Sequence, residues 1–339
     1  MKMNRIDTDP SYFQLMKLYD NFIRSQGITL QDPSEDTFLK AFNEILLKHK
    51  QRANLIHGFR VQALFAHMAA ALGKCVFITE EDSGEFFSKY EDQKRPDFRI
   101  VTDDGNQFLV EVKNFHETNL DKPFVMKKNY LDNLMNYSKY FRCELKIAIY
   151  WSKWKLWSLI SPLNFDINES IYSINFFKAL KQSEMHLLGD CWIGTVPPLS
   201  IRFETETLSR SLSNHYEFKI KKVSLFAAGN CIEDEVEKNV ASFLMFFGDW
   251  QNIDKPAQVE DGKLVSFELQ LYPIEEVKNQ GFQIIGQLSQ MISRQYDLLT
   301  TENGIIKTIN PVQFDGMGVA IPNDYNGHAL KLWRFYMQI

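Results

Sequence analysis

Three charged side chains that could together hydrolyse a phosphate ester lie within residues 95–114. They are Asp97, Glu111 and Lys113, in the segment RPDFRIVTDDGNQFLVEVKN. Carboxylate oxygens are ligands that Mg²⁺ prefers, and the ion usually keeps several waters when it binds them. A magnesium ion held by both acids and by the backbone carbonyl of Val112 would neutralise phosphate charge and activate a bound water. Because Lys113 could orient or deprotonate that water, these residues predict metal-assisted phosphodiester hydrolysis.

Two strands joined by a tight turn would bring these side chains together. Residues 97–101 and 108–113 have strand-like patterns, and an Asp-Gly turn signal lies between them. Side chains alternate along a strand, so Glu111 and Lys113 share one face, and pairing about the turn places Asp97 beside Glu111. An exposed hairpin with a surface Glu–Lys pair would explain two of the charges, but not the converging Asp97.

Helices are expected before this hairpin, and further strands around it. Apolar residues at helical spacing predict helices at residues 10–26, 35–50 and 54–72. The following segments predict a strand at 75–79, a polar loop at 80–95, a helix at 125–141 and strands at 145–151 and 156–160. The first half is therefore expected to be helices followed by a mostly antiparallel sheet with one inserted helix.

The motif and the order of elements match a known pattern. Pro-Asp at residues 96–97 and Glu-Val-Lys at residues 111–113 resemble the signature of PD-(D/E)xK nucleases, the restriction-endonuclease-like superfamily. The order helix, three strands, helix and strand over residues 54–160 also looks like the core of that family. A bare motif of this kind is weak evidence, but its placement on two predicted strands strengthens it.

The resemblance implies a fold, an activity and a set of roles. The fold would be α+β or α/β, with a restriction-endonuclease-like core in which helices flank a mixed sheet. Asp97 and Glu111 would bind Mg²⁺, with Mn²⁺ able to substitute, and Lys113 would serve catalysis. The activity would be that of an endonuclease of restriction, defence or repair type, with DNA favoured over RNA. Double-strand cleavage would need two such sites, so a homodimer is plausible.

The sequence departs from the family on its first core helix. Many members carry a glutamate there in a Gly-x-x-x-Glu arrangement, whereas here Gly58 is followed by Gln62. A glutamine carbonyl is a neutral and weaker ligand, so Gln62 is a candidate site residue that leaves the number of metals open. The alternatives are one metal, a water-bridged contact or an acid from elsewhere, and the nearest acids are Glu80, Glu81 and Glu85.

The helix after the motif is a candidate contact for the substrate strand. Lys127 and Lys128 open the predicted helix, and Tyr130 and Tyr137 continue along it. Related nucleases often use this helix to reach the substrate. A solvated helix face with half-buried tyrosines would give the same pattern.

A second candidate contact lies between two later strands. Lys153 and Lys155 bracket Trp154, and basic residues interleaved with an aromatic can grip phosphate and stack a base. A tight hairpin with a packed tryptophan is the competing interpretation.

Composition and charge set limits on the class of protein. The chain has 339 residues, of which 45% are hydrophobic and 24% charged, so an intrinsically disordered chain is excluded. Its net charge of −5 divides into +2 over residues 1–165 and −7 over residues 166–339.

Four cysteines without a CxxC pair argue against a zinc site. No signal-peptide pattern and no long apolar run occur, so we expect a soluble, cytoplasmic protein with no membrane partner.

The second half is predicted to be a separate, strand-rich α+β domain. Its clearest elements are strands at 216–226 and 264–272, helices at 233–247 and 282–299, and a closing strand in LKLWRFYMQI. Acidic residues at the start of the 233–247 helix are expected to complement the helix dipole rather than hold a metal. The predicted domains are an N-terminal helical extension (1–53), a nuclease core (54–165) and a C-terminal domain for specificity, dimerisation or regulation (166–339).

Two other functions compete with the nuclease. A non-catalytic nucleic-acid-binding module on the same fold would explain why Gln62 stands where an acid is expected. A ligand- or partner-regulated nuclease effector would use the acidic second half to bind a protein partner and to cover the cleft until released.

Overall fold

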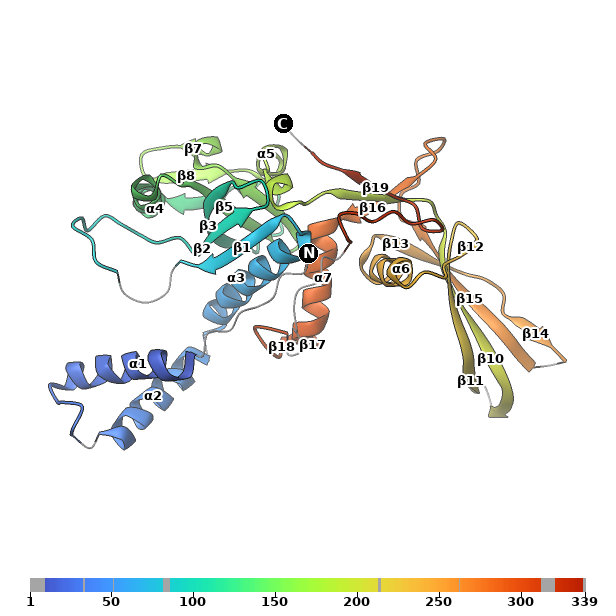
Figure 1. Cartoon of the computed structure of the whole chain (residues 1–339), viewed down its shortest axis with the longest axis horizontal. Helices are drawn as coiled ribbons and strands as arrows, with labels where there is room; N and C mark the ends of the chain where they lie inside the picture. Colours follow the sequence, from blue (N-terminus) through green and yellow to red (C-terminus); the bar gives the residue numbers. More distant parts are fainter. Residues whose placement is uncertain are drawn as a thin grey trace.

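The computed structural model of the chain describes residues 10–32, 34–50, 52–81, 86–212, 215–261, 263–311 and 321–337. Within these residues the fold is of mixed α+β type, with seven α-helices and a mixed central sheet. Figure 1 shows an elongated molecule with an N-terminal helical pair at one end and long strands at the other.

The N-terminal helices form a pair that projects from the rest of the chain (Figure 1). They are α1 (Pro10–Gln26) and α2 (Glu35–Lys50), which confirms both predicted helices. Phe38 is buried between them, with its ring 5.2 Å from that of Tyr19 and 5.5 Å from that of Phe22. This small aromatic contact holds the pair together.

The core is a five-stranded sheet preceded by a long helix. The helix α3 (Ala53–Leu72) ends at Gly73, whose φ of 89° is the left-handed conformation that glycine adopts most easily. The strands are β1 (Cys75–Glu80), β2 (Phe98–Thr102), β3 (Gln107–Phe115), β5 (Glu144–Trp151) and β6 (Leu156–Ile160), in the order β1-β2-β3-β5-β6. The pairs are antiparallel except β3–β5, which is parallel. The sheet is therefore mixed, as a crossover through a helix requires.

Helices cover both faces of this sheet. Along β3, Val110 and Val112 belong to the hydrophobic cluster of α3, whereas Leu109 belongs to the cluster of α4 (Lys128–Phe141). The alternation of side chains thus gives β3 two apolar neighbours and places the face of Glu111 toward α4.

The segment predicted as a helix at 125–141 begins instead with a strand. β4 (Phe124–Lys127) pairs with β8 (Ile171–Ile174), which also pairs with β7 (Asp166–Ile167). Its residues alternate between buried and exposed, so the period is 2 until the helix begins at Lys128. The partner strand lies far along the sequence, which is why local spacing alone gave the wrong start.

The C-terminal half contains a six-stranded antiparallel sheet and a smaller three-stranded one. The larger sheet comprises β10 (Leu199–Leu212), β11 (His215–Ala227), β12 (Asn230–Cys231), β13 (Trp250–Asp254), β14 (Gln258–Glu260) and β15 (Lys263–Pro273). The smaller comprises β9 (Trp192–Thr195), β16 (Gln283–Gln287) and β19 (Leu332–Phe335). The remaining elements are α5 (Phe176–Lys181), α6 (Glu235–Phe247), α7 (Leu288–Thr300), β17 (Thr301–Glu302), β18 (Ile305–Ile306) and two short 3₁₀ turns at Pro162–Asn164 and Met185–Leu188.

The predicted strands at 216–226 and 264–272 are confirmed, as is the helix at 233–247. The closing strand is confirmed over Leu332–Phe335, and residues 338–339 of that prediction lie outside the described residues. The helix predicted at 282–299 begins only at Leu288, because residues 283–287 pair with β9. Buried Asp190 marks this boundary, since its carboxylate accepts the backbone N–H of Ser289 at 2.9 Å. Burial raises the pKa of Asp190 to about 6, although the hydrogen bond from Ser289 acts to lower it.

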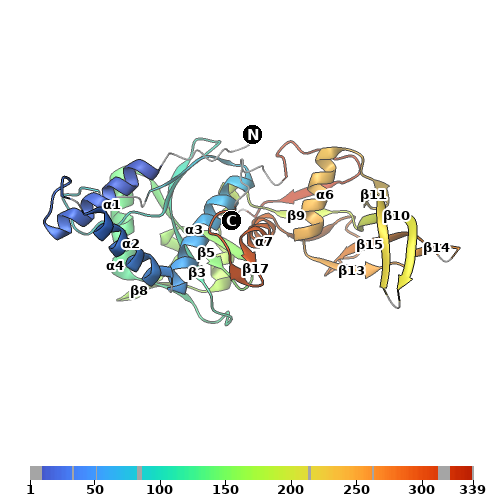
Figure 2. The ribbon, with the colours of Figure 1, turned by 90° about the horizontal axis from the view of Figure 1, so that it is seen from below.

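Helix α7 ties the C-terminal half to the core. It packs on α3, where Arg60 donates to Asp297 at 2.6 Å, and Trp157 of β6 donates to Ser293 at 3.0 Å. Figure 2 shows α3 and α7 side by side, as in Figure 1. The domain limits given above stay a prediction.

Helix α3 also has the length and hydropathy of a membrane span over Asn54–Leu72, and of the described helices it is the one that does. More than half of that stretch, 56%, is buried inside the protein. Its packing on the sheet and on α7 accounts for its apolar character.

Candidate active site

The two acids of the motif lie side by side on neighbouring strands. Phe98 pairs with Val110 in the β2–β3 register, so Asp97, just before β2, falls opposite Glu111. Asp97 is 8% exposed and Glu111 is 1% exposed. The predicted convergence of two carboxylates at one end of the hairpin is therefore present in the structure.

Two neighbours hold Asp97 in place. The backbone N–H of Val112 donates to its Oδ2 at 2.6 Å, and the side-chain amide of Gln62 donates to its Oδ1 at 2.6 Å. The structure thus brings Gln62 from α3 to the site. There it donates a hydrogen bond to Asp97, whereas a glutamate would repel that carboxylate when no cation lies between them.

Glu111 belongs to a compact cluster with Lys113 and Tyr130. Glu111 Oε1 accepts hydrogen bonds from the Lys113 ammonium and from the Tyr130 hydroxyl. The Lys113 ammonium lies 3.0 Å from the Tyr130 hydroxyl oxygen and 4.8 Å from the centre of that ring. The sequence predicts Tyr130 as a substrate contact, whereas the structure places its hydroxyl against Glu111 and Lys113.

Electrostatics fix the charge state within this cluster. Burial alone would lower the pKa of Lys113, but the charge of Glu111, together with Tyr130, outweighs burial and leaves that pKa raised. Burial, followed by the charge of Glu111, raises the pKa of Tyr130. Lys113 is thus an ammonium, and Tyr130 is a neutral hydroxyl that donates to the carboxylate.

The residues present fit one hard divalent cation. Glu111 Oε2 is buried, and no described residue bonds to it. A buried carboxylate oxygen without a donor is costly, and a cation would satisfy it. Among the described residues no three His, Cys, Asp or Glu side chains gather as a metal site, so two protein carboxylates are what this pair of strands offers. Such a set leaves positions for waters, as Mg²⁺ requires.

The acids considered as substitutes for the missing glutamate have other roles or positions. Glu81 accepts two hydrogen bonds from Arg99, at 2.8 and 3.2 Å, and one from Tyr137 at 2.5 Å. Burial would raise the pKa of Glu81, but these hydrogen bonds outweigh it and hold that pKa below its usual value. Glu80 is the exposed last residue of β1, and Glu85 lies outside the described residues.

The predicted substrate contacts divide into two groups. Lys127 and Lys128 lie where β4 meets α4, one turn before Tyr130, with Lys127 exposed and Lys128 half-buried. Tyr137 is buried with its hydroxyl on Glu81, so its ring does not face a substrate.

The lysines around Trp154 also differ from each other. Lys155 is engaged by Asp297 of α7 at 2.5 Å, whereas Lys153 is exposed. Trp154 packs on Phe176, with ring centres 5.2 Å apart. The packed hairpin therefore describes this segment better than a base-stacking site.

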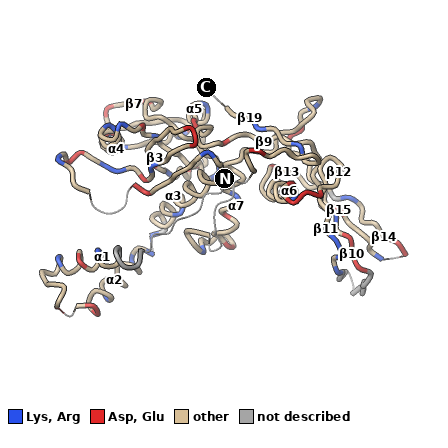
Figure 3. Tube along the Cα trace, viewed as in Figure 1, with Lys and Arg blue, Asp and Glu red and all other residues tan. Residues whose placement is uncertain are grey.

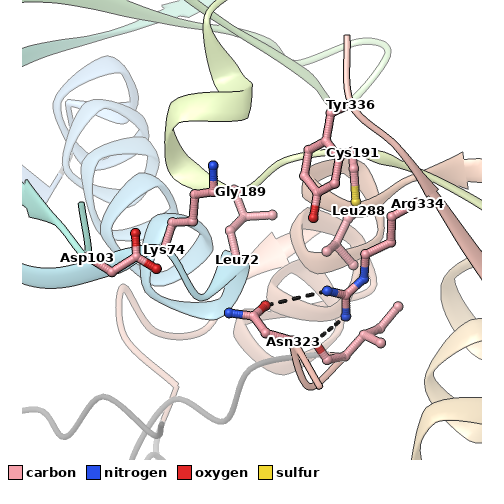
Figure 4. Close-up of a pocket in the computed structure, with 10 residues that line it drawn as sticks. Leu72, Lys74, Asp103, Gly189, Cys191, Leu288, Asn323, Arg334 and Tyr336 are labelled. Carbon is pink, nitrogen blue, oxygen red and sulfur yellow. Dashed lines mark hydrogen bonds between the residues drawn. The ribbon is translucent and has the colours of Figure 1, made fainter. Parts of the chain in front are cut away.

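A pocket of about 150 Å³ lies elsewhere, between the end of α3 and β19 (Figure 4). Its two cations are already used by the protein: Arg334 donates to the backbone oxygens of Ile321 and Pro322, at 2.9 and 2.6 Å, and Lys74 to that of His186 at 3.3 Å. None of the motif residues lines it.

No protein-family model matches the sequence. No curated protein matches it either. Among solved structures, part of the chain is similar to Hjc, a Holliday junction resolvase from the archaeal hyperthermophile Archaeoglobus fulgidus. The identity is 15% and the TM-score 0.27, over 34% of this chain and 88% of that chain.

Proposed function

We propose that the protein is a metal-dependent endonuclease that hydrolyses phosphodiester bonds, with DNA favoured over RNA. The observation that carries the proposal is the buried pair Asp97 and Glu111, with Lys113 bonded to Glu111 and one oxygen of Glu111 left without a donor. The order α3, the central-sheet strands β1 to β3, α4 and further strands also follows the order that the PD-(D/E)xK resemblance implies, with β4 of a separate sheet added before α4.

Each residue has a defined task in this proposal. Asp97, Glu111 and the backbone carbonyl of Val112 would hold Mg²⁺, which when bound neutralises phosphate charge and lowers the pKa of a coordinated water. Gln62 keeps Asp97 oriented. The Lys113 ammonium stands beside the metal-binding acid, where it can orient the attacking water and stabilise negative charge that develops on the phosphate.

Cleavage of a substrate panel tests the proposal. Supercoiled, linear, single-stranded and branched DNA, and RNA, are incubated with Mg²⁺ or Mn²⁺ and with EDTA. The wild type is expected to cut at least one of these in a metal-dependent way, and Glu111→Gln to cut none. Cutting that persists in EDTA, or equal cutting by both proteins, would refute the metal-dependent site.

A non-catalytic nucleic-acid-binding module is the second candidate. The observation in its favour is that Gln62 occupies the position where an acid is expected, so the described site offers two carboxylates and not three. Binding of nucleic acid without any cleavage, and without any binding of Mn²⁺, is the result that favours it.

A homodimer is part of the proposal, and α2 offers the surface. Exposed apolar residues follow one another on this helix, with Leu39 58%, Phe42 40%, Ile45 55% and Leu46 46% exposed. Its first turn is acidic and its last turn basic. A two-fold antiparallel pairing of two α2 helices would bury the apolar residues and bring each acidic end to a basic end.

Regulation through the acidic C-terminal half also stays a proposal. Figures 1 and 2 both place β10, β11 and β14 at the end of the molecule away from α4, so in this arrangement those strands do not cover the candidate site. Contact between the halves runs instead through α7 on α3, with Asp297 bonded to Arg60. A protein partner bound by the C-terminal half would act on the site through that contact.

A further inference from the structure

An exposed aromatic surface lies beside the candidate site, on the loop before β2 and on the last turns of α4. Its members, here called the aromatic patch, are Phe86, Phe87, Tyr90, Tyr140 and Phe141. Phe87 is 100% exposed, and the other four are 43–60% exposed. Single exposed apolar residues are ordinary, but five large rings on two adjoining segments mark a binding surface.

Contacts between the loop and α4 hold the patch in shape. The rings of Tyr90 and Tyr140 are stacked, with centres 5.9 Å apart and an interplanar angle of 25°. Asn136 of α4 donates to Asp92 of the loop at 3.1 Å, and the loop backbone at Lys94 donates to the carbonyl of Asn133 at 3.2 Å. The rings are therefore presented by two segments that are bonded to each other.

Basic side chains are interleaved with these rings. Residues 86–95 and 137–142 carry five of them against two acids, Glu91 and Asp92, and the five are Lys89, Lys94, Arg95, Lys139 and Arg142. The Arg95 guanidinium lies 4.9 Å from the ring centre of Phe86. Figure 3 shows Lys and Arg on this loop and on α4, at the end of the molecule away from the long C-terminal strands. The patch thus combines π faces with net positive charge.

The patch is continuous with the candidate site through Tyr130. The Lys94 ammonium lies 5.0 Å from the centre of the Tyr130 ring, and the hydroxyl of that ring bonds to Glu111 and lies 3.0 Å from the Lys113 ammonium. A strand whose phosphate reaches Lys113 would therefore lie close to Lys94, whose neighbour Arg95 contacts the ring of Phe86.

We infer that the aromatic patch binds the unpaired bases of a single-stranded nucleic-acid segment adjoining the bond that is cut. Alternating aromatic and basic groups suit such a strand, because each base offers a π face and each phosphate a negative charge. In a duplex the base faces are stacked on one another and are not available to protein rings. The position of the cut bond rests on the proposed nuclease, whereas the binding itself does not.

Binding of single strands without cleavage tests the inference. Fluorescence anisotropy in EDTA is measured for the full chain with labelled oligodeoxythymidine, oligouridine and a DNA duplex. Replacing both Phe87 and Tyr140 by alanine is expected to weaken single-strand binding at least about tenfold and to leave duplex binding unchanged. Phe246→Ala, which removes a 78% exposed ring on α6, is the matched control and is expected to change neither.

The outcomes distinguish binding by the aromatic patch from cleavage by the proposed nuclease site. Equal loss of single-strand and duplex binding in the double variant, or no loss in either, overturns the inference, as does a wild type that binds neither single strand. The deoxy and ribo arms tell which nucleic acid the patch prefers. Patch-dependent binding by a protein that cuts nothing with Mg²⁺ would support the inferred binding by the patch and contradict the proposed nuclease function.

Discussion

At the scale of single residues, the candidate site is held together by side chains that touch the motif without being part of it. Gln62 and the Val112 amide occupy both oxygens of Asp97, while Tyr130 and Lys113 share one oxygen of Glu111. Such neighbours orient metal-binding carboxylates and tune their basicity. The free oxygen of Glu111 is then the position left for a cation.

Removing the Tyr130 hydroxyl tests its positioning role. We expect Tyr130→Phe to lower kcat about tenfold with little change in KM, because the ring stays while the donor to Glu111 is lost. Single-turnover cleavage measures this, with Tyr336→Phe, at an exposed tyrosine outside the candidate site and the aromatic patch, as the control that should cut normally. A Tyr130→Phe enzyme with normal kcat would show that the hydroxyl only fills space.

Metal binding should depend on Glu111. Calorimetric titration with Mn²⁺ is expected to show binding to the wild type that is lost in Glu111→Gln. The substitution removes the negative charge and, with the remaining oxygen held by Lys113 and Tyr130, puts an NH₂ group where the free oxygen was. Glu117→Gln, which changes an exposed carboxylate after β3, is the control and should bind as the wild type does. The absence of any binding to the wild type would favour the non-catalytic module.

The sequence spacing predicts that the central residues pair, but it does not predict the contacts that hold them in place. The alternation of β3 and the turn before it are local, so Asp97 and Glu111 could be paired from the sequence. The position of Tyr130 could not be derived that way, because it depends on α4 beginning at Lys128, after a strand whose partner lies at residues 171–174. The sequence predicts Tyr130 as a candidate site residue, but it does not predict the contact of its hydroxyl with Glu111.

At the scale of elements, buried polar side chains lie where helices contact other parts of the chain. His67 on α3 is 2% exposed, and its ring lies 5.3 Å from that of Tyr296 on α7. Burial lowers the pKa of His67 to about 4. The folded protein therefore binds a proton at this residue less readily than the unfolded chain does.

Acid should weaken the α3–α7 contact through His67. Since the folded pKa is the lower one, this stabilisation is present above the unfolded value of about 6.5 and is lost as pH falls toward 4. Between pH 7 and pH 5 the free energy of unfolding should fall by about 2 kcal/mol from this group. Denaturant unfolding of wild type and His67→Phe at both pH values measures it, and an equal fall in the two proteins would contradict the assignment.

Glu237 anchors the segment before β19 to α6. It is 5% exposed, and it accepts the backbone N–H groups of His328, Ala329 and Leu330 at 2.6–3.1 Å. Glu237→Ala should lower the free energy of unfolding by about 3 kcal/mol, because these donors lose their acceptor. Glu235→Ala, at an exposed acid of the same turn, should change it by less than about 0.5 kcal/mol. Similar losses in the two variants would show that Glu237 acts only as a first-turn charge.

The acidic start of α6 shows what a local pattern can and cannot specify. Dipole complementarity was the sequence expectation, and Asp234 does cap the helix by accepting the N–H of Glu237 at 2.9 Å. The second role of Glu237, toward residues 328–330, depends on a contact across the chain that spacing does not reveal. Elements whose partners are distant, such as β4 and β16, were missed for the same reason.

At the scale of the whole molecule, different kinds of surface lie in different places. Basic and aromatic side chains gather beside the candidate site, exposed apolar residues lie on α1 and α2, and the long C-terminal strands project the other way (Figures 1 and 3). The net charge of −5 therefore does not describe the surface that would face a polyanion.

The proposed dimer can be tested on α2. Replacing both Leu39 and Leu46 by aspartate should convert a dimer to a monomer, because it puts like charges into the apolar contact. Light scattering coupled to size-exclusion chromatography measures the mass, with Leu163→Asp, at a 90% exposed position outside α2, as the control. A wild type that is monomeric at every concentration would refute this dimer.

The most direct test of the central claim is cleavage by wild type, Lys113→Ala and Lys153→Ala side by side with Mg²⁺. Lys113 lies in the Glu111 cluster, whereas Lys153 is an exposed lysine outside it. The predicted result is metal-dependent cutting by wild type and Lys153→Ala and a loss of at least about a hundredfold in Lys113→Ala. Equal cutting by all three proteins, or no cutting of any substrate by the wild type, would contradict the claim that Asp97, Glu111 and Lys113 form a nuclease site.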